Sequence, residues 1–235
     1  MDAEQAWERI KRGETGEKFA AFYDLLSFYN KKFNLTRITD REECEKKHFF
    51  DSLTGERYFP AGARCAEVGS GGGFPSVPLL IVRGDLSFDL FESSQKKCAF
   101  LCEVVDKLGL HARVHALRAE EAARDPAFRE RFDVCTARAV ARLATLSEYC
   151  APLVRVGGAF AAYKGKAEEE LAEAEAAFRT LGLELRTAER FFLEGESDER
   201  MLIVAEKVRN TPAAYPRGRG KERSAPLGVR EKKGK

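Results

Sequence analysis

The 235-residue sequence has few of the side chains on which hydrolases and metalloenzymes depend. It contains only three histidines, and it shows neither a nucleophile elbow nor a metal-ligand spacing. The six cysteines are scattered and form no C-x-x-C pair, which favours reduced thiols in a cytoplasmic protein over disulfides or zinc. No apolar run is long enough to span a membrane, and the polar N-terminus lacks a signal-peptide core. The sequence thus predicts no metal site and no membrane segment.

What the sequence does contain is a glycine cluster between two apolar segments. The first segment ends with Glu67 and Val68, the second begins at Pro75, and the glycines between them are Gly69, Gly71, Gly72 and Gly73. A strand, a glycine turn and a helix open many nucleotide-binding α/β domains. A dinucleotide fingerprint needs a third glycine at position 74, where Phe74 stands and disfavours an NAD-dependent enzyme. The pattern E-x-G-x-G-x-G instead resembles motif I of class I S-adenosylmethionine (SAM) methyltransferases; the alternative is a glycine turn without a ligand.

Helical and strand patterns alternate after an N-terminal helical region. We predict helices over 3–12, 16–33, 40–59, 75–83, 94–108 and 166–181, one starting near 119 and one ending near 153, and strands over 63–68, 86–91, 112–117, 132–136, 159–163, 183–192 and 200–208, with a turn at 157–158. Alternation indicates a parallel sheet covered on both faces, and two final strands without a helix between them indicate one antiparallel member. The predicted fold class is therefore α/β, a Rossmann-like class I methyltransferase sheet with added N-terminal helices. The predicted parts are a helical region (1–60), a SAM-binding domain (61–208) and a basic tail (209–235).

Polar residues follow three further strands at the end where such sheets bind ligands. Glu92, with Ser93 and Ser94, follows the second strand, where a carboxylate can accept both ribose hydroxyls of a nucleoside. Ala119 and Glu120 follow the third strand, and Arg138 follows the fourth. The alternatives are that Glu92 caps the next helix, that Glu120 is a first-turn helix acid, and that Arg138 lies there by chance.

The charge is unevenly distributed along the chain. Residues 207–235 contain ten Lys or Arg and two acids, a net charge of +8, whereas the whole chain has a net charge of +2. Such a tail suits phosphate contacts with a polyanion such as RNA, and the alternative is a solubilising disordered tail. The candidate RNA-binding residues are Arg217, Arg219, Lys221 and Arg223.

Short motifs along residues 33–227 closely resemble one family, the bacterial small-subunit ribosomal RNA guanine-N7 methyltransferases (GidB or RsmG). They are F-N-L-T at 33–36, K-H-F-F-D-S-L at 47–53, E-V-G-S-G-G-G-F-P at 67–75, K-K-x-x-F-L at 96–101, A-E at 119–120, A-R-A at 137–139, K-G at 164–165, Y-P-R-x-x-G at 215–220 and P-L at 226–227. Motif I is shared by all class I enzymes, and the motifs outside it carry the specificity. The family usually has Asp and Gly where this sequence has Glu67 and Ser76.

This resemblance implies methyl transfer from SAM to N7 of a guanine in the 530 loop of 16S ribosomal RNA, by a cytoplasmic monomer that acts on the RNA or the small ribosomal subunit. It assigns SAM contacts to Glu67, Gly69, Gly71, Phe74, Glu92, Ser93, Ser94, Ala119, Glu120 and Arg138, and candidate catalytic roles to Arg138, His48 and Lys164. Asp51 is a further candidate, with these three, for orienting the base or the RNA. Guanine N7 has a free lone pair, so no general base is needed. His48 is equally well explained as an ordinary helix histidine. The other functions considered are a SAM methyltransferase for a small molecule or protein, and an RNA-binding protein with an inactive Rossmann-like domain.

Overall fold

The computed structural model describes residues 11–229, so most of the predicted helix over 3–12 lies outside the described residues. The N-terminal region is helical as predicted. It comprises α2 (Gly13–Asn30), α3 (Arg41–Cys44), the π-helical η1 (Glu45–Phe50), α4 (Asp51–Leu53) and the short η2 (Glu56–Tyr58). Asp40 caps α3, because its carboxylate accepts a hydrogen bond from the Glu43 amide at 2.9 Å. The predicted single helix over 40–59 is thus four consecutive helical segments.

A seven-stranded sheet forms the centre of the molecule, in the order β3-β2-β1-β4-β5-β7-β6. The strands are β1 (Arg64–Val68), β2 (Ser87–Phe91), β3 (Ala112–His115), β4 (Phe132–Arg138), β5 (Val154–Lys164), β6 (Leu183–Phe192) and β7 (Glu199–Lys207). The first five pair in parallel, and β7 is antiparallel to both of its neighbours. The predicted parallel sheet with one antiparallel member is therefore confirmed.

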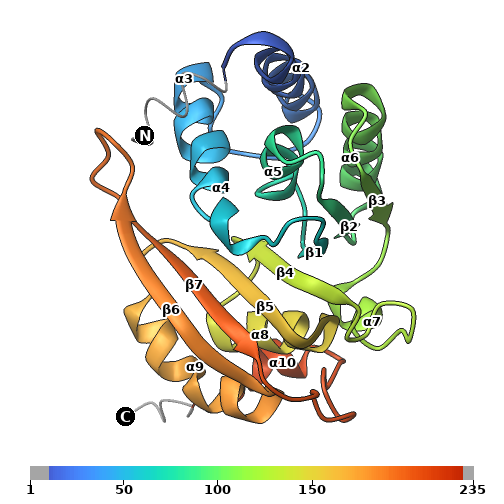
Figure 1. Ribbon diagram of the computed structural model, residues 1–235, viewed down its shortest axis with the longest axis vertical. Coiled ribbons are helices and arrows are strands. Elements are labelled where there is room, and N and C mark those ends of the chain that lie inside the picture. The colour runs from blue at the N-terminus through green and yellow to red at the C-terminus, as the bar shows by residue number, and fades with distance from the viewer. Residues whose placement is uncertain (1–10, 230–235) are drawn as a thin grey trace.

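Helices cover both faces of this sheet (Figure 1). On one face α5 (Ser76–Val82) and α6 (Gln95–Leu108) pack together with α2, so the N-terminal region and the sheet share one apolar core. On the other face α8 (Leu143–Cys150) and α9 (Glu168–Leu181) enclose a second core, with the short α7 (Ala119–Ala122), η3 (Ala151–Leu153) and α10 (Lys221–Ser224) nearby. Among residues 11–229, no helix is both long and apolar enough to cross a bilayer.

The predicted turn at Gly157-Gly158 is wrong, because both glycines lie inside β5. Gly157 has a φ of +81°, and a Cβ on Gly158 would lie 2.6 Å from the Asp133 carbonyl oxygen. The pairing of β4 with β5 shifts register at the same place. Glycine therefore permits an irregular close approach of two adjacent strands, and it does not end the strand.

The last described residues, 209–229, form an arm that is tied to the domain, and we call this segment the C-terminal arm. The Arg129 guanidinium donates to the carbonyl oxygens of Thr211 and Tyr215, at 2.8 and 2.9 Å. The Thr145 hydroxyl donates to the Glu222 carbonyl oxygen at 2.7 Å, and Leu227 packs against the second core. The described part of the basic tail is thus packed against the domain, and the last six residues of the tail, 230–235, lie outside the described residues.

Candidate functional site

A cleft of about 460 Å³ opens at the carboxyl ends of the first three strands, and we call it the strand-end cleft. Predicted cofactor residues that line it are Gly69, Glu92, Ser93, Ala119 and Glu120. Val140 and Tyr149, which were not predicted for any site, also line it, as do Arg219 and Arg223, which were predicted to bind RNA. Parallel strands bring their carboxyl ends to one edge of the sheet, which is why residues that are far apart in the sequence meet there.

Glu92 holds the glycine turn against the start of α6. Its carboxylate accepts hydrogen bonds from the Gly71 amide at 3.0 Å and from the Ser94 amide at 2.8 Å. Gly69 and Gly71 have φ of +69° and +50°, a region that favours glycine. The predicted residues Gly71 and Ser94 therefore contact the cleft-lining Glu92 through their amides, and neither is itself among the residues that line the cleft.

Glu67 lies beneath the turn and is fully buried. Its carboxylate accepts hydrogen bonds from the Ser76 hydroxyl at 2.6 Å and from the Ser76 amide at 3.3 Å. Burial raises the pKa of Glu67 to about 7, although the bonds from Ser76 work in the opposite direction. The two departures from the family motif, Glu67 and Ser76, are therefore direct partners. Glu67 is not among the residues that line the strand-end cleft.

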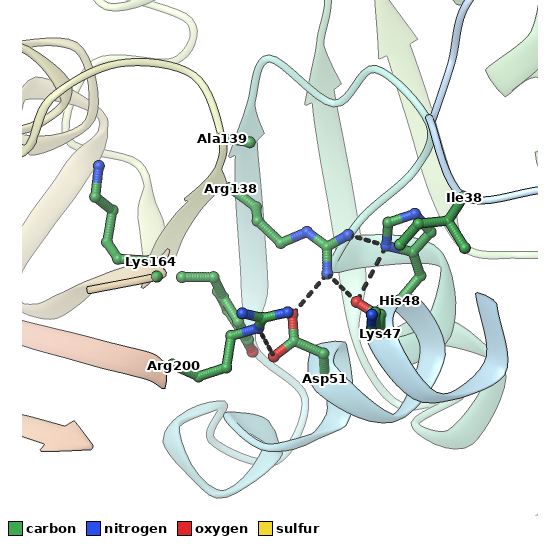
Figure 2. A pocket seen from close by; sticks show the side chains of 10 residues that line it. Ile38, Lys47, His48, Asp51, Arg138, Ala139, Lys164 and Arg200 are labelled. Atoms are coloured by element: carbon green, nitrogen blue, oxygen red, sulfur yellow. Dashed lines mark hydrogen bonds and ion pairs between the residues drawn. The ribbon is translucent and has the colours of Figure 1, made fainter. Parts of the chain in front are cut away.

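A second pocket, of about 230 Å³, surrounds Arg138 at the end of β4, and we call it the arginine pocket. It is lined by Ile38, Lys47, His48, Asp51, Arg138, Ala139, Tyr163, Lys164, Gly165 and Arg200. Figure 2 shows the Arg138 guanidinium pointing toward Asp51 and His48. It donates to the Asp51 carboxylate at 2.8 Å, and the other Asp51 oxygen lies 3.8 Å from Nε of Arg200. The carboxylate thus lies between two arginines, while burial raises its pKa.

His48 is a neutral partner of Arg138. Burial, together with the nearby guanidinium, lowers the pKa of His48 to about 3. Because Nδ1 then accepts from Arg138, Nε2 carries the proton and donates to the Thr36 hydroxyl at 2.6 Å. The imidazole stacks on Phe74 with ring centroids 4.5 Å apart, and the guanidinium lies over the same ring at 5.0 Å. The predicted residues His48, Phe74 and Arg138 therefore form one cluster, which lies apart from the strand-end cleft.

Lys164 is in the arginine pocket, but its amino group extends away from Arg138 (Figure 2). The amino group donates to the Ala141 carbonyl oxygen at 2.9 Å and pairs with Glu170 at 2.7 Å. Lys164 thus fixes the chain that follows β4. Lys47 is likewise committed, because its amino group lies 2.8 Å from Glu43 and 3.1 Å from Glu196 in the β6–β7 hairpin.

The chain from Arg138 to Val140 separates the two pockets. Arg138 and Ala139 line the arginine pocket, whereas Val140 lines the strand-end cleft. Ala139 has a φ of +56°, and a Cβ on Gly69 would lie 2.7 Å from a Val140 methyl group. A ligand in the cleft and a ligand in the pocket would therefore face the same three-residue wall from opposite sides.

Comparisons with known proteins agree with this geometry. The family described as rRNA small subunit methyltransferase G (GidB) matches residues 15–199. The chain belongs to this family. The ribosomal RNA small subunit methyltransferase G of Lactobacillus johnsonii is 46% identical over 218 residues, which cover 90% of this chain and 91% of that protein. The corresponding protein of Exiguobacterium sibiricum is 44% identical over 216 residues, 90% of this chain and 91% of that one.

Solved structures outside the methyltransferase G family share the fold. A geranyl diphosphate methyltransferase in complex with SAM superimposes with a TM-score of 0.54 at 13% identity, covering 68% of this chain and 85% of that one. A tRNA methyltransferase of Bacillus subtilis superimposes with a TM-score of 0.53 at 16% identity, covering 70% of this chain and 68% of that one. The predicted class I methyltransferase fold and the predicted family are thus confirmed, and the chain is a methyltransferase.

Sequence reasoning missed several residues of both pockets. Lys47 is one of them: it stands four residues before Asp51, which the sequence does offer as a candidate for orienting the base or RNA, and both lie in the K-H-F-F-D-S-L motif of methyltransferase G. Arg200 and Tyr149 stand in no motif, and only the fold brings them to the pockets. Arg217, predicted to bind RNA, instead pairs with the buried Glu148 at 2.7 Å.

Proposed function

We propose that this protein transfers a methyl group from SAM to N7 of a guanine in the 530 loop of 16S ribosomal RNA. The observation that carries this proposal is the pair of pockets on either side of the Arg138–Val140 wall, in a chain of the methyltransferase G family. The strand-end cleft would hold the cofactor, and the arginine pocket would receive the base. Family membership supports the small-subunit ribosomal RNA as the substrate, and the motifs support the N7 position.

The residues of the strand-end cleft fit SAM. Gly69 presents backbone without a side chain, and the nearly buried Glu92 carboxylate, which also accepts from the Gly71 amide, faces the same space, where ribose hydroxyls could donate to it. Ala119 and Glu120 follow the next strand and would lie toward the adenine. When bound, SAM supplies an electrophilic methyl group. The protein then has to bring a nucleophile in line with that methyl and to exclude water.

Guanine suits the arginine pocket because its N7 and O6 are adjacent acceptors on one edge. A donor that binds O6 orients the base and leaves the N7 lone pair free. We assign that donor to Arg138, whose guanidinium is held by Asp51 and His48 and stacked on Phe74. Lys164 has a positioning role, because it ties the chain after β4 to Glu170.

We further propose that the protein acts as a monomer in the cytoplasm, where its ribosomal substrate is found. Phosphate contacts from the basic tail would steer the RNA toward the arginine pocket. Of the tail residues predicted for this task, Arg217 is paired with Glu148, Arg219 and Arg223 line the strand-end cleft, and Lys221 is exposed. The tail charge also includes Lys207, which is fully buried and bonded to the Ala151 carbonyl oxygen at 2.6 Å.

The test is the position of the methyl group. Ribosomal RNA from a deletion strain, and from the same strain carrying the gene again, should be digested and mapped by mass spectrometry. We expect one 7-methylguanine in the 530 loop that is lost on deletion and restored by the gene. A methyl group on an exocyclic amine or a ring carbon, or an unchanged ribosomal RNA, would contradict the proposal. Purified protein with naked RNA or with small subunits then identifies the form of the substrate.

A further inference from the structure

Two arginines of the C-terminal arm lie at the strand-end cleft. Arg219 and Arg223 line the cleft together with Glu120, which follows β3, and Tyr149, which lies on α8. Tyr149, on α8, lies near enough to Arg223 that the guanidinium opposes the rise that burial gives to the pKa of the tyrosine hydroxyl. One wall of the cleft is therefore formed by the C-terminal arm, which follows the last strand of the sheet.

The arm is held firmly enough to fix these two side chains. Arg217 binds the buried Glu148 with three guanidinium contacts of 2.7 to 3.2 Å, and its amide donates to the same carboxylate at 2.8 Å. The fully buried Glu222 accepts a hydrogen bond from the Gly218 amide. Anchors on both sides of Arg219 thus set the path of the chain across the cleft, and Arg219 itself has a φ of +58°.

We propose that the C-terminal arm completes the cofactor site and that Arg219 and Arg223 bind the adenosyl end of SAM. This inference rests on the proposed function, because it concerns the same cofactor. Glu92 marks the ribose position, and Glu120 lies toward the adenine, so the arginines beyond them face the base of the nucleoside. A planar guanidinium can stack on a purine and donate to its ring nitrogens, which a lysine cannot do equally well. Arginines predicted to bind RNA are thereby assigned to the cofactor.

Affinity measurements without RNA test this assignment. Arg219→Ala, Arg223→Ala and the double variant should be titrated calorimetrically with SAM and with 5′-methylthioadenosine, which has the adenosyl group but lacks the amino acid part. We expect the double variant to lose about tenfold in affinity for both ligands. Arg186→Ala, an exposed charge on β6 at the other edge of the sheet, is the matched control and should bind both ligands as the parent does. Equal thermal unfolding midpoints would show that the variants fold.

Lysine substitutions test whether the two arginines bind the cofactor or a phosphate of the RNA. Arg219→Lys with Arg223→Lys keeps both charges but loses the planar groups, so SAM affinity should still fall, whereas a phosphate contact would largely survive. Unchanged SAM affinity in the folded alanine variant, with weaker RNA binding and a flatter salt dependence, would overturn the inference and make the arm an RNA contact. A parent protein that binds no SAM would instead contradict the proposed function, so the two failures are distinguishable.

Discussion

The two pockets of this protein are built in different ways. The strand-end cleft is formed largely by residues that follow a strand directly, with Tyr149 of α8 and the two arginines of the C-terminal arm added to them, and its glycine turn is held by the carboxylate of Glu92. The arginine pocket is formed by side chains from η1, α4, β4, β5 and β7, and these side chains bind one another: Arg138 with Asp51 and His48, and Asp51 with Arg200. The first pocket thus depends on local turns, and the second depends on tertiary packing.

This difference reflects what each pocket has to recognise. A backbone cradle at strand ends suits a small cofactor that many enzymes share. A buried network of charges suits one substrate group, because every member is already oriented and little reorganisation accompanies binding. The network also makes the arginine pocket vulnerable, since removal of one member leaves its partner buried without compensation.

Arg138→Ala should have the largest effect on activity. The variant loses the donor assigned to the base, so the methyl-transfer rate should fall about 100-fold or more. It also leaves Asp51 buried without its nearest cation, which should cost about 3–5 kcal/mol of stability. Transfer to small subunits in single turnover, together with urea unfolding, measures both.

A double variant separates the two losses at Arg138. Asp51→Asn combined with Arg138→Ala also removes the buried carboxylate that has lost its cation. The double variant should therefore recover much of the stability, but it should not recover the methyl-transfer rate. Recovery of the rate along with the stability would show that Arg138 acts only through folding. SAM affinity should change little in either variant, because Arg138 is not among the residues that line the strand-end cleft.

Gly71→Val tests the other pocket and should have the next largest effect. A Cβ on Gly71 would meet only the Gly69 carbonyl oxygen, at 3.6 Å, so the domain has room for the side chain even though the φ of +50° is unfavourable. The branched chain would occupy space on the glycine turn and should weaken SAM binding about tenfold or more. A folded variant with the SAM affinity of the parent would contradict the assignment of this turn.

Gly62→Val is a matched control for the backbone cost. Gly62 also has a positive φ, of +68°, and a Cβ there would meet no atom within 4 Å, but it lies before β1, at the opposite end from the cleft. The Gly62→Val variant should lose about as much stability as Gly71→Val and should keep the SAM affinity of the parent.

Much of the strand-end cleft could be predicted from the sequence, and much of the arginine pocket could not. Glu92 and Glu120 were identified because each follows an apolar strand, and parallel strands end at one edge. Arg200 follows no comparable rule, since it starts an antiparallel strand whose register only the folded sheet determines. The partners of the basic residues could not be predicted by counting charges: Arg217 pairs with Glu148, and Lys207 lies 3.3 Å from Glu130, although both acids are distant in sequence.

The third prediction concerns Glu67 and the dependence of stability on pH. Because burial raises the folded-state pKa to about 7 from an ordinary value of 4.5, the folded protein binds more protons than the unfolded chain between these values. Stability should therefore fall as pH rises from about 4.5 to 7, by up to about 3 kcal/mol from this group, and change no further above that range. Urea unfolding of parent and Glu67→Gln at pH 5 and pH 8 measures the difference. Glu67→Gln should lack this part of the decline in stability. An identical decline in both proteins would contradict the prediction.

Substitution of His48 should have the smallest effect on activity, and its pH dependence tests the mechanism most directly. Its pKa of about 3 keeps the imidazole neutral throughout the physiological range, with Nδ1 accepting from Arg138. Because guanine N7 loses no proton on methylation, the rate on bound substrate should be nearly flat from about pH 6.5 to 9. His48→Asn retains an oxygen acceptor for the guanidinium, so we expect a decrease of only a few-fold and the same flat profile. The opposite result would be a rate that rises with pH through an inflection near pH 6.5. If that inflection disappeared in His48→Asn but persisted in variants of His111 and His115, His48 would be a general base. Such a result would contradict attack by a nitrogen that is already deprotonated.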